Sequence, residues 1–309
     1  MLPLRVPRWS GDDPAAIGRC VSAPPFVVYP PVARRERWAI RGGHRAVVHA
    51  GMVEAESWAV LVPGFTGSKE DFIALWEPLA AAGVGVVAFD QLGQYESDGS
   101  DDPRDYALDS LAADLGEVVA TAASRLGRSD PPHLVGHSFG GLVAQQAVID
   151  GAVRPASLVA LCTGPGALPE ERWGELPALI DALGSMSLGD LWQVLKVMES
   201  AVGVEPPRPA VDDFLRARWL GNSPVQLRCV ARLLMEQPSL TDRLRPIVAG
   251  GLPTTVMWGE SDDAWPIGVQ QEMAVRLGAP AVELPGTGHS PNVDRPDVLV
   301  AALLRAWRG

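Results

Sequence analysis

The feature that most limits the possible folds of this chain is a series of short apolar runs, bounded by turn residues and separated by helix-length segments. Runs of this kind, rich in valine and too short for buried helices, are typical of parallel strands covered on both faces of a sheet. We expect such strands at residues 58–62, 84–89, 133–135, 157–161, 253–258 and 281–284. The intervening helices are expected at residues 69–82, 106–126, 139–150, 267–277 and 296–307. The sequence therefore predicts an α/β fold.

Two further strands are expected before these runs. Apolar and polar residues alternate within residues 34–40 and again within 46–50, which predicts half-exposed strands at an antiparallel edge. The sheet would then have eight strands and be mostly parallel. Residues 1–31 contain seven prolines, and proline fixes φ and removes a backbone donor, so we expect an irregular arm over residues 1–32.

The alternation of strands and helices breaks once. Between Cys162 and Thr254 about 90 residues show helical periodicity and proline breaks but no convincing strand. We interpret this interval as an inserted helical cap. The predicted domains are the arm at 1–32, a core at 33–164 and 246–309, and the cap at 165–245.

Composition excludes several classes of protein. Apolar residues make up 47% of the chain and charged residues 20%, which is typical of a globular protein and not of a disordered one. The net charge of −11 would repel phosphate backbones, so we expect no nucleic-acid partner. The longest nearly unbroken apolar stretch, Leu79 to Phe89, has 11 residues, so no membrane span is expected.

The N-terminus and the cysteines indicate a cytoplasmic protein. The first ten residues contain no apolar run of the length that a secretory signal needs. Cys20, Cys162 and Cys229 are odd in number and far apart, which fits neither a disulfide framework nor a metal site. We expect no metal and no cofactor.

The motif Gly136-His137-Ser138-Phe139-Gly140 lies directly between an expected strand and an expected helix. A serine at such a turn requires glycine two residues before and two after, because side chains there would collide with the strand and helix. The turn exposes the serine hydroxyl at the carboxyl edge of the sheet. Ser138 is therefore our candidate nucleophile.

A serine nucleophile needs an imidazole to accept its proton and a carboxylate to orient that imidazole. His289 follows the last expected strand, in a loop at the same edge of the sheet. His44 and His49 lie in the early edge strands, and His133 begins a buried strand. His137 adjoins the serine but is expected to point elsewhere. We therefore expect His289 to be the base.

The acid is expected between the serine and the histidine in chain order. Asp262 follows the expected strand that ends at Trp258, and it lies 124 residues after Ser138 and 27 before His289. It is our first choice, with Asp263 as the alternative one residue away. Asp263 could instead cap the helix that begins near residue 266.

The reaction also needs N–H donors for the oxyanion that develops on the substrate. The backbone N–H of Phe139 follows the serine. A second donor is expected in the loop Pro63-Gly64-Phe65, which follows another strand, where Gly64 lets the backbone expose the N–H of Phe65.

These motifs resemble those of α/β-hydrolase-fold enzymes of the cap-bearing esterase and lipase type, from about Trp58 to Leu304. The resemblance implies a mostly parallel eight-stranded sheet with helices on both faces and an inserted helical cap. It also assigns Ser138 as nucleophile, His289 as base, Asp262 as acid, and Phe65 and Phe139 as oxyanion donors.

The chain departs from the family pattern in two loops. Residues 90–97 resemble the turn usually written Asp-x-Arg-Gly-x-Gly-x-Ser, but Leu92 replaces the arginine and Tyr95 the second glycine. Pro63 replaces the usual histidine of the oxyanion loop. Both departures leave open the geometry of these loops.

The serine predicts the type of reaction. Relatives that dehalogenate alkyl halides or open epoxides carry aspartate at this turn, so Ser138 indicates acyl transfer. We expect a serine hydrolase that cleaves a carboxylic ester of a small or medium apolar substrate through an acyl-enzyme intermediate. Thioester, amide and carbon–carbon cleavage, peracid formation, and a binding protein without turnover remain alternatives. The oligomeric state is left open.

Three other side chains carry expectations. Trp192 lies in the expected cap, at a spacing compatible with the wall of an acyl pocket, and Trp265, three residues after Asp262, is expected near its entrance. Lys69, one of two lysines, is expected to begin a solvated helix face.

Overall fold

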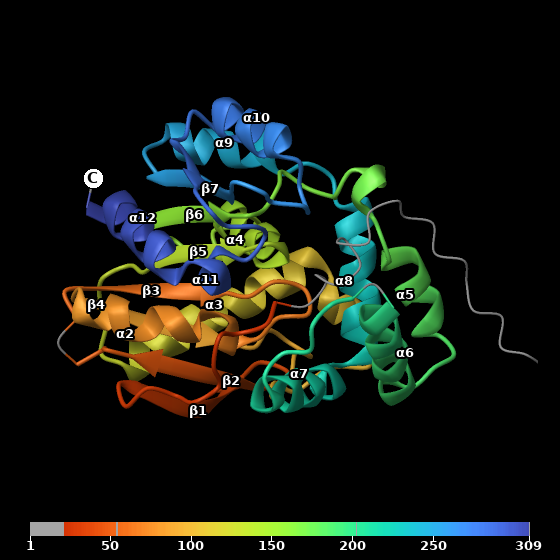
Figure 1. Ribbon diagram of the computed structural model, residues 1–309. Helices are drawn as coiled ribbons and strands as arrows, with labels where there is room; N and C mark the ends of the chain where they lie inside the picture. The colour runs from red at the N-terminus through yellow and green to blue at the C-terminus, as the bar shows by residue number, and fades with distance from the viewer. Residues whose placement is uncertain (1–21, 54, 202, 309) are drawn as a thin grey trace, which may run out of the picture.

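The computed structural model describes residues 22–53, 55–201 and 203–308, so most of the predicted N-terminal arm lies outside the described residues. The strands are β1 (Ala33–Ile40), β2 (Gly43–Ala50), β3 (Ser57–Val62), β4 (Val84–Phe89), β5 (His133–His137), β6 (Ser157–Leu161), β7 (Thr254–Gly259) and β8 (Ala281–Leu284). The helices are α2 (Ile73–Ala81), α3 (Leu108–Arg125), α4 (Phe139–Ile149), α5 (Leu176–Ala182), α6 (Leu188–Ala201), α7 (Pro209–Gly221), α8 (Pro224–Glu236), α9 (Thr241–Ala249), α10 (Ile267–Leu277), α11 (Pro291–Asp294) and α12 (Pro296–Arg308). Short 3-10 helices are η1 (Lys69–Phe72), η2 (Pro103–Tyr106) and η3 (Glu170–Arg172). Strands and helices alternate along the chain from β3 to β6, and the helices α5 to α9 then follow one another before β7 (Figure 1).

The strands form one eight-stranded sheet in the order β1-β2-β4-β3-β5-β6-β7-β8. Strands β3 to β8 run parallel to one another. Strand β2 pairs antiparallel with both β1 and β4, which makes the antiparallel edge that the alternating sequence predicts. The predicted eight-stranded, mostly parallel sheet is confirmed.

Helices cover both faces of the sheet. Because successive side chains of a strand point to opposite faces, each strand contributes to a core on either side. In β3, Trp58, Val60 and Val62 pack in a core with helices α3, α4 and α10, whereas Ala59 and Leu61 pack with α2 and α12.

The expected strands at 58–62 and 133–135 match β3 and β5 within two residues, but the helix expected at 69–82 is divided. Its first turn is the 3-10 helix η1, and α2 begins at Ile73.

Among its described residues, 162–201 and 203–253, the interval between β6 and β7 contains helices joined by loops and no strand. Helices α5 to α8 lie together beyond one end of the sheet, while α9 lies next to α10 over the sheet (Figure 1). A buried ion pair ties this insertion to the core, because Arg218 of α7 donates to Asp71 of η1 at 2.6 Å. The boundaries of a cap at 165–245 remain a prediction.

Lys69 is buried rather than solvated, with 1% of its surface exposed. Its ammonium lies 2.9 Å from carboxylate oxygens of Glu70 and Asp90 and 2.7 Å from one of Glu96. Burial alone would lower the pKa of Lys69, but Asp90 and Glu70 raise it above its ordinary value. The expectation of a solvated helix face was wrong because these carboxylates compensate the buried charge.

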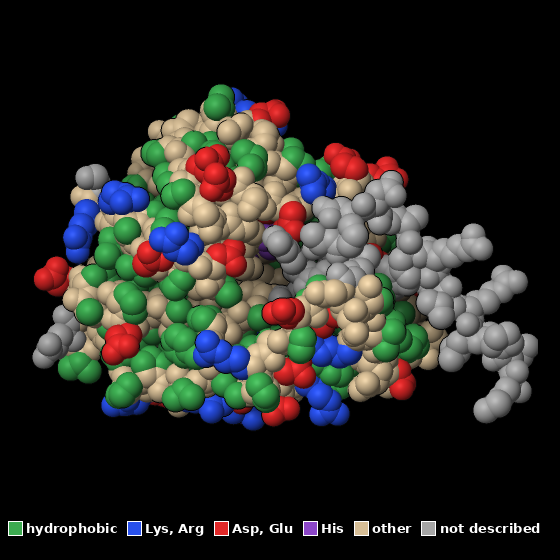
Figure 2. All heavy atoms as spheres, in the orientation of Figure 1, with side chains coloured by type: hydrophobic (Ala, Val, Ile, Leu, Met, Phe, Trp, Pro, Cys, Tyr) green, Lys and Arg blue, Asp and Glu red, His purple; other side chains and the backbone are tan. Residues whose placement is uncertain are grey.

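The described residues contain no helix that is long and apolar enough to cross a membrane. On the part of the surface that these residues form in Figure 2, basic and acidic side chains are interspersed, and no basic patch gathers there.

Candidate active site

The predicted site residues come together at the carboxyl edge of the parallel strands. Ser138 follows β5, the Gly64–Phe65 loop follows β3, Asp262 follows β7 and His289 follows β8. Because parallel strands end at the same edge of a sheet, residues far apart in the chain meet there.

Ser138 lies in a sharp turn between β5 and α4, with φ 55° and ψ −125°. Such a conformation costs a non-glycine residue roughly 1–3 kcal/mol, so the surrounding structure must hold it. The flanking glycines are required by close approaches. A methyl group at Gly140 would lie 2.4 Å from the carbonyl oxygen of Val62, and one at Gly136 would lie 2.5 Å from the carbonyl oxygen of Gly140.

A chain of hydrogen bonds joins the hydroxyl, the imidazole and the carboxylate. The Oγ of Ser138 lies 2.9 Å from Nε2 of His289, and Nδ1 of His289 lies 2.8 Å from Oδ1 of Asp262. The carboxylate also accepts from the backbone N–H of Ala264 at 3.0 Å and from the Gln270 amide at 2.9 Å. Because a carboxylate accepts, Nδ1 carries the proton and Nε2 is left to accept from the serine hydroxyl.

The charges of the hydrogen-bonded side chains favour a His289 imidazole that accepts a proton more readily than a free one. Burial disfavours the charged imidazolium, but the Asp262 carboxylate raises the pKa of His289 above its ordinary value. Burial would likewise raise the pKa of Asp262, but His289 and the hydrogen bonds from Gln270 and Ala264 hold it below its usual range. Asp262 therefore stays ionised while His289 takes up a proton.

Among the described residues, the side chain of Asp263, the alternative acid, makes no hydrogen bond to His289; its backbone carbonyl accepts from Arg172 at 3.2 Å. Helix α10 has Pro266 at its N-cap, with no side-chain cap bond. The expectation that Asp263 caps this helix was therefore wrong. The structure brings Asp262, and not its neighbour, into hydrogen-bond contact with the imidazole.

The two candidate oxyanion donors belong to segments next to the serine. Phe139 opens α4, where N–H groups lack intrahelical partners. The loop before Phe65 lies against Ser138, because a methyl group at Gly64 would be 3.1 Å from Cβ of Ser138. Within residues 22–53, 55–201 and 203–308, the backbone N–H groups of Phe65 and Phe139 have no hydrogen-bond acceptor.

In the turn at residues 90–97, both positions where the family pattern has glycine have a left-handed backbone conformation, although one of them is not glycine in this chain. Gly93 has φ 74°, and Tyr95, at the position of the second glycine, has φ 38°. Leu92, in place of the arginine, is buried in the core. The turn is therefore closed by glycine at one position and by a strained tyrosine at the other.

His137 was expected to point away from the site, and this was wrong. Its Nε2–H donates to the backbone carbonyl of His289 at 2.7 Å, so it holds the loop that carries the candidate base. Burial and the neighbouring imidazole lower the pKa of His137 to about 4, which keeps it neutral.

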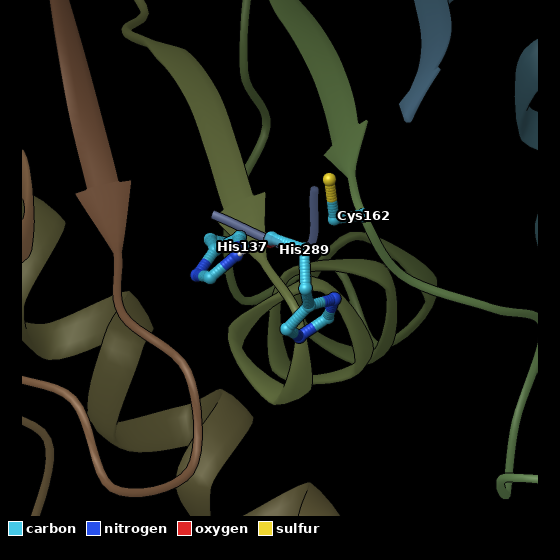
Figure 3. A group of neighbouring side chains, drawn as sticks. All are labelled: His137, Cys162 and His289. Carbon is cyan, nitrogen blue, oxygen red and sulfur yellow. Dashed lines mark hydrogen bonds between the residues drawn. The ribbon is translucent and has the colours of Figure 1, made fainter. Parts of the chain in front are cut away.

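Cys162, which follows β6, completes a compact group with the two histidines (Figure 3). Ligand atoms of His137, Cys162 and His289 lie within 4.8 Å of one another. However, both ring nitrogens of His289 and one of His137 already make hydrogen bonds, and the sulfur of Cys162 points away from the ring of His289 in Figure 3. Burial and Asp262 raise the pKa of the Cys162 thiol. The geometry therefore favours two histidines held by hydrogen bonds over a metal centre formed by these three side chains.

The two tryptophans predicted to bind substrate lie in different surroundings. Trp265 is 1% exposed, its ring packs 6.4 Å from that of His289, and its indole N–H donates to the carbonyls of Gly166 and Ala167. Its polar edge holds the beginning of the insertion, and its place near the entrance of an acyl pocket remains a prediction. Trp192 lies in the apolar cluster of the inserted helices, against which Phe65 also packs.

Sequence reasoning missed several supporting side chains. Gln270 contacts Asp262, the candidate acid, and His137 contacts the backbone of His289, the candidate base. Gln91 and Gln94 contact the loop beside Ser138. The position of His137 next to the serine was a signal that could have been used. The glutamines carry no pattern that marks them in the sequence.

Comparison with known proteins agrees with this fold. Residues 59–302 match the model of the family described as the alpha/beta hydrolase family. Over 260 residues the chain is 30% identical to a protein of Variovorax paradoxus named as a carbamate hydrolase, RutD, and the match covers 81% of this chain and 91% of that one. Over 204 residues it is 29% identical to the pimeloyl-[acyl-carrier protein] methyl ester esterase of Aeromonas hydrophila, covering 63% of this chain and 74% of that one. A solved structure of a hydrolase from Pseudomonas aeruginosa superposes with a TM-score of 0.70 at 22% identity, covering 89% and 99% of the two chains.

Proposed function

Because the chain belongs to the alpha/beta hydrolase family, a family of hydrolases, we propose that it is a serine hydrolase that cleaves a carboxylic ester of a small or medium apolar substrate. The observation that carries this proposal is the hydrogen-bonded chain from Ser138 through His289 to Asp262 at 2.9 and 2.8 Å. The strained turn at Ser138 supports it, because strain of this kind is concentrated at functional sites.

In the first half of the reaction, the Oγ of Ser138 attacks the substrate carbonyl while its proton passes to Nε2 of His289. The negative charge of Asp262 stabilises the imidazolium that forms. The oxyanion of the tetrahedral intermediate accepts hydrogen bonds from the N–H groups of Phe65 and Phe139. When the intermediate collapses, the proton on His289 is delivered to the leaving alcohol, and the acyl group stays on the serine.

In the second half, a water molecule takes the place of the alcohol. His289 accepts a proton from this water as it attacks the acyl carbonyl, and the same N–H groups stabilise the second oxyanion. Collapse releases the carboxylic acid and returns the proton to Ser138. Each step uses the same line of three side chains.

The apolar character of the substrate is proposed from the cluster next to the oxyanion loop. Phe65 packs against the buried side chains of the inserted helices, a cluster that contains Trp192, Leu215 and Trp219. An apolar acyl or alcohol group bound near this cluster would be removed from water, which contributes roughly 25 cal/mol per Å² of buried apolar surface. Activity should therefore increase with acyl length until the space is filled.

A carbamate is the second candidate substrate, because the relative from Variovorax paradoxus is named as a carbamate hydrolase. The same serine can attack a carbamate carbonyl, so the proposed residues do not distinguish the two. Thioester cleavage, carbon–carbon cleavage and peracid formation would use the same three side chains, and a binding protein would keep them without turnover.

The test combines covalent labelling with a substrate panel. We expect a fluorophosphonate to label the wild type stoichiometrically and Ser138→Ala not at all, with both proteins folded. The matched control is Ser157→Ala, because Ser157 also contacts an imidazole, that of His133 at 2.8 Å, but lies at the start of β6. Labelling of Ser138→Ala at the wild-type rate would refute the proposal.

The panel contains p-nitrophenyl esters of increasing acyl length, matched carbamates, and a binding assay for the corresponding acids. Preferred turnover of the esters is expected. Faster turnover of the carbamates would select the second candidate. Tight binding of the acids without burst or turnover would instead identify a binding protein.

A further inference from the structure

Two glutamine side chains of the turn after β4 contact the backbone of the oxyanion loop. The amide of Gln91 donates to the carbonyl of Pro63 at 2.8 Å. The amide of Gln94 donates to the carbonyls of Gly64 at 2.7 Å and Phe65 at 3.0 Å. Both glutamines occupy variable positions of the turn pattern, so the pattern itself assigns them no role.

The Gln94 amide is fully used and can adopt only one orientation. Its Oε1 accepts from the backbone N–H of Gln91 at 3.0 Å, so its NH₂ group must face the two carbonyls. The reverse orientation would place an acceptor against two acceptors. With 0% of its surface exposed, Gln94 has no water to replace these bonds.

The peptide between Gly64 and Phe65 depends on this amide. Besides Gln94, the Gly64 carbonyl accepts only a longer bond, 3.3 Å, from the N–H of Gly67, as judged over the described residues. Glycine allows many backbone conformations, so a peptide next to it rotates easily unless it is held. Glycine suits this position because a methyl group here would make a tight contact, 3.1 Å, with Cβ of Ser138.

Holding this carbonyl also aims the N–H group. In a planar trans peptide the C=O and N–H point in opposite directions. Fixing the Gly64 oxygen on Gln94 therefore directs the Phe65 N–H to the other side of the peptide. We propose that Gln94 is a positioning residue of the oxyanion hole, which aims the Phe65 N–H at the developing oxyanion. This inference rests on the proposed function, since it deepens the role of the same site.

The kinetic test compares the wild type with Gln94→Met, which keeps the side-chain length and removes the amide. We expect kcat and kcat/KM for a p-nitrophenyl ester to fall together by about 10- to 100-fold, somewhat less than for the outright loss of an oxyanion donor. KM should change less than about threefold. The affinity for an alkyl boronic acid, which forms a tetrahedral adduct with the serine, should fall in the same proportion.

The matched control is Gln145→Met. Gln145 lies in α4, is also 0% exposed, and donates to one backbone carbonyl, that of Gly164 at 3.1 Å. Its loss should cost comparable thermal stability but change kcat less than about threefold. An equal fall in kcat for both variants, or no fall for Gln94→Met, would overturn the inference. If Gln94→Met does not fold, Gln94→Asn, which retains the amide on a shorter side chain, replaces it in the same assays.

A readout without turnover separates this inference from the proposed function. Selective ¹⁵N labelling of the six phenylalanines gives a small set of amide signals, among which Phe65→Leu identifies that of Phe65. We expect this signal to shift in Gln94→Met and to stay in place in Gln145→Met; an unchanged signal in Gln94→Met would refute the positioning role. If the wild type shows neither labelling nor turnover, the proposed function fails, while the Phe65 signal still decides the role of Gln94.

Discussion

The substitution Asp262→Asn tests how the carboxylate supports the base. In the structure Oδ1 accepts from His289 at 2.8 Å and Oδ2 accepts from Gln270 at 2.9 Å. The substitution keeps the shape of the side chain but removes the charge that stabilises the imidazolium. With charge centres about 4 Å apart and an effective dielectric constant of about 20, this attraction is worth about 4 kcal/mol. That corresponds to a loss of roughly 10³-fold in rate.

A further loss comes from the hydrogen bonds. The backbone N–H of Ala264 donates to the same carboxylate, so both of its oxygens face N–H donors. An amide presents an NH₂ group to one of them, which removes a hydrogen bond worth about 1 kcal/mol. We therefore expect kcat/KM to fall by roughly 10³- to 10⁴-fold.

The assay is steady-state hydrolysis of a p-nitrophenyl ester between pH 5 and 9, with thermal unfolding as the measure of folding. The control is Asp263→Asn, which changes the adjacent carboxylate and should alter kcat/KM less than about threefold. The acid limb of the profile should move to lower pH in Asp262→Asn only, because the charge that raises the pKa of His289 is gone. An equal loss in both variants, or a larger one in Asp263→Asn, would refute this account of the acid.

Two other predictions follow from charges in the structure. Because His289 must be neutral to accept a proton and Asp262 raises its pKa, wild-type kcat/KM should rise with pH through a midpoint above about 6.5 and then level off; a flat profile from pH 5 to 8, with chemistry rate-limiting, would contradict this role. Lys69→Met leaves the buried Asp90 unpaired and should lower the free energy of unfolding by about 3 kcal/mol in urea titrations. The other lysine, Lys196, is partly exposed, so Lys196→Met should cost less than about 1 kcal/mol, and equal costs would show that the buried pair is not stabilising.

The parts of the site that the sequence predicts are those controlled by local geometry. The turn at Ser138 needs glycines at 136 and 140, and the structure shows the backbone contacts that exclude a side chain there. The order of the strands then brings the loops of Asp262 and His289 to the same edge. Short valine-rich runs predicted the sheet well because burial on both faces leaves little choice of residue.

The parts that the sequence did not predict depend on contacts across this edge. Lys69 is buried because two carboxylates from the chain after β4, those of Asp90 and Glu96, join the adjacent Glu70 around it, and those two lie far from it in the sequence. The role of Gln94 exists only because its turn lies against the loop after β3. Trp265 is buried by the beginning of the insertion, whose path could not be derived from helical periodicity. Polar side chains of this kind become interpretable only once their partners are known.

The central claim is that Ser138 carries the acyl group during turnover. Rapid acid quench of the wild type with a p-nitrophenyl ester, followed by mass spectrometry of the digested protein, measures this directly. The account predicts an increase equal to the acyl mass on the peptide that contains Ser138, and no such increase in Ser138→Ala. An acyl group on another residue, or turnover by Ser138→Ala at the wild-type rate, would contradict it.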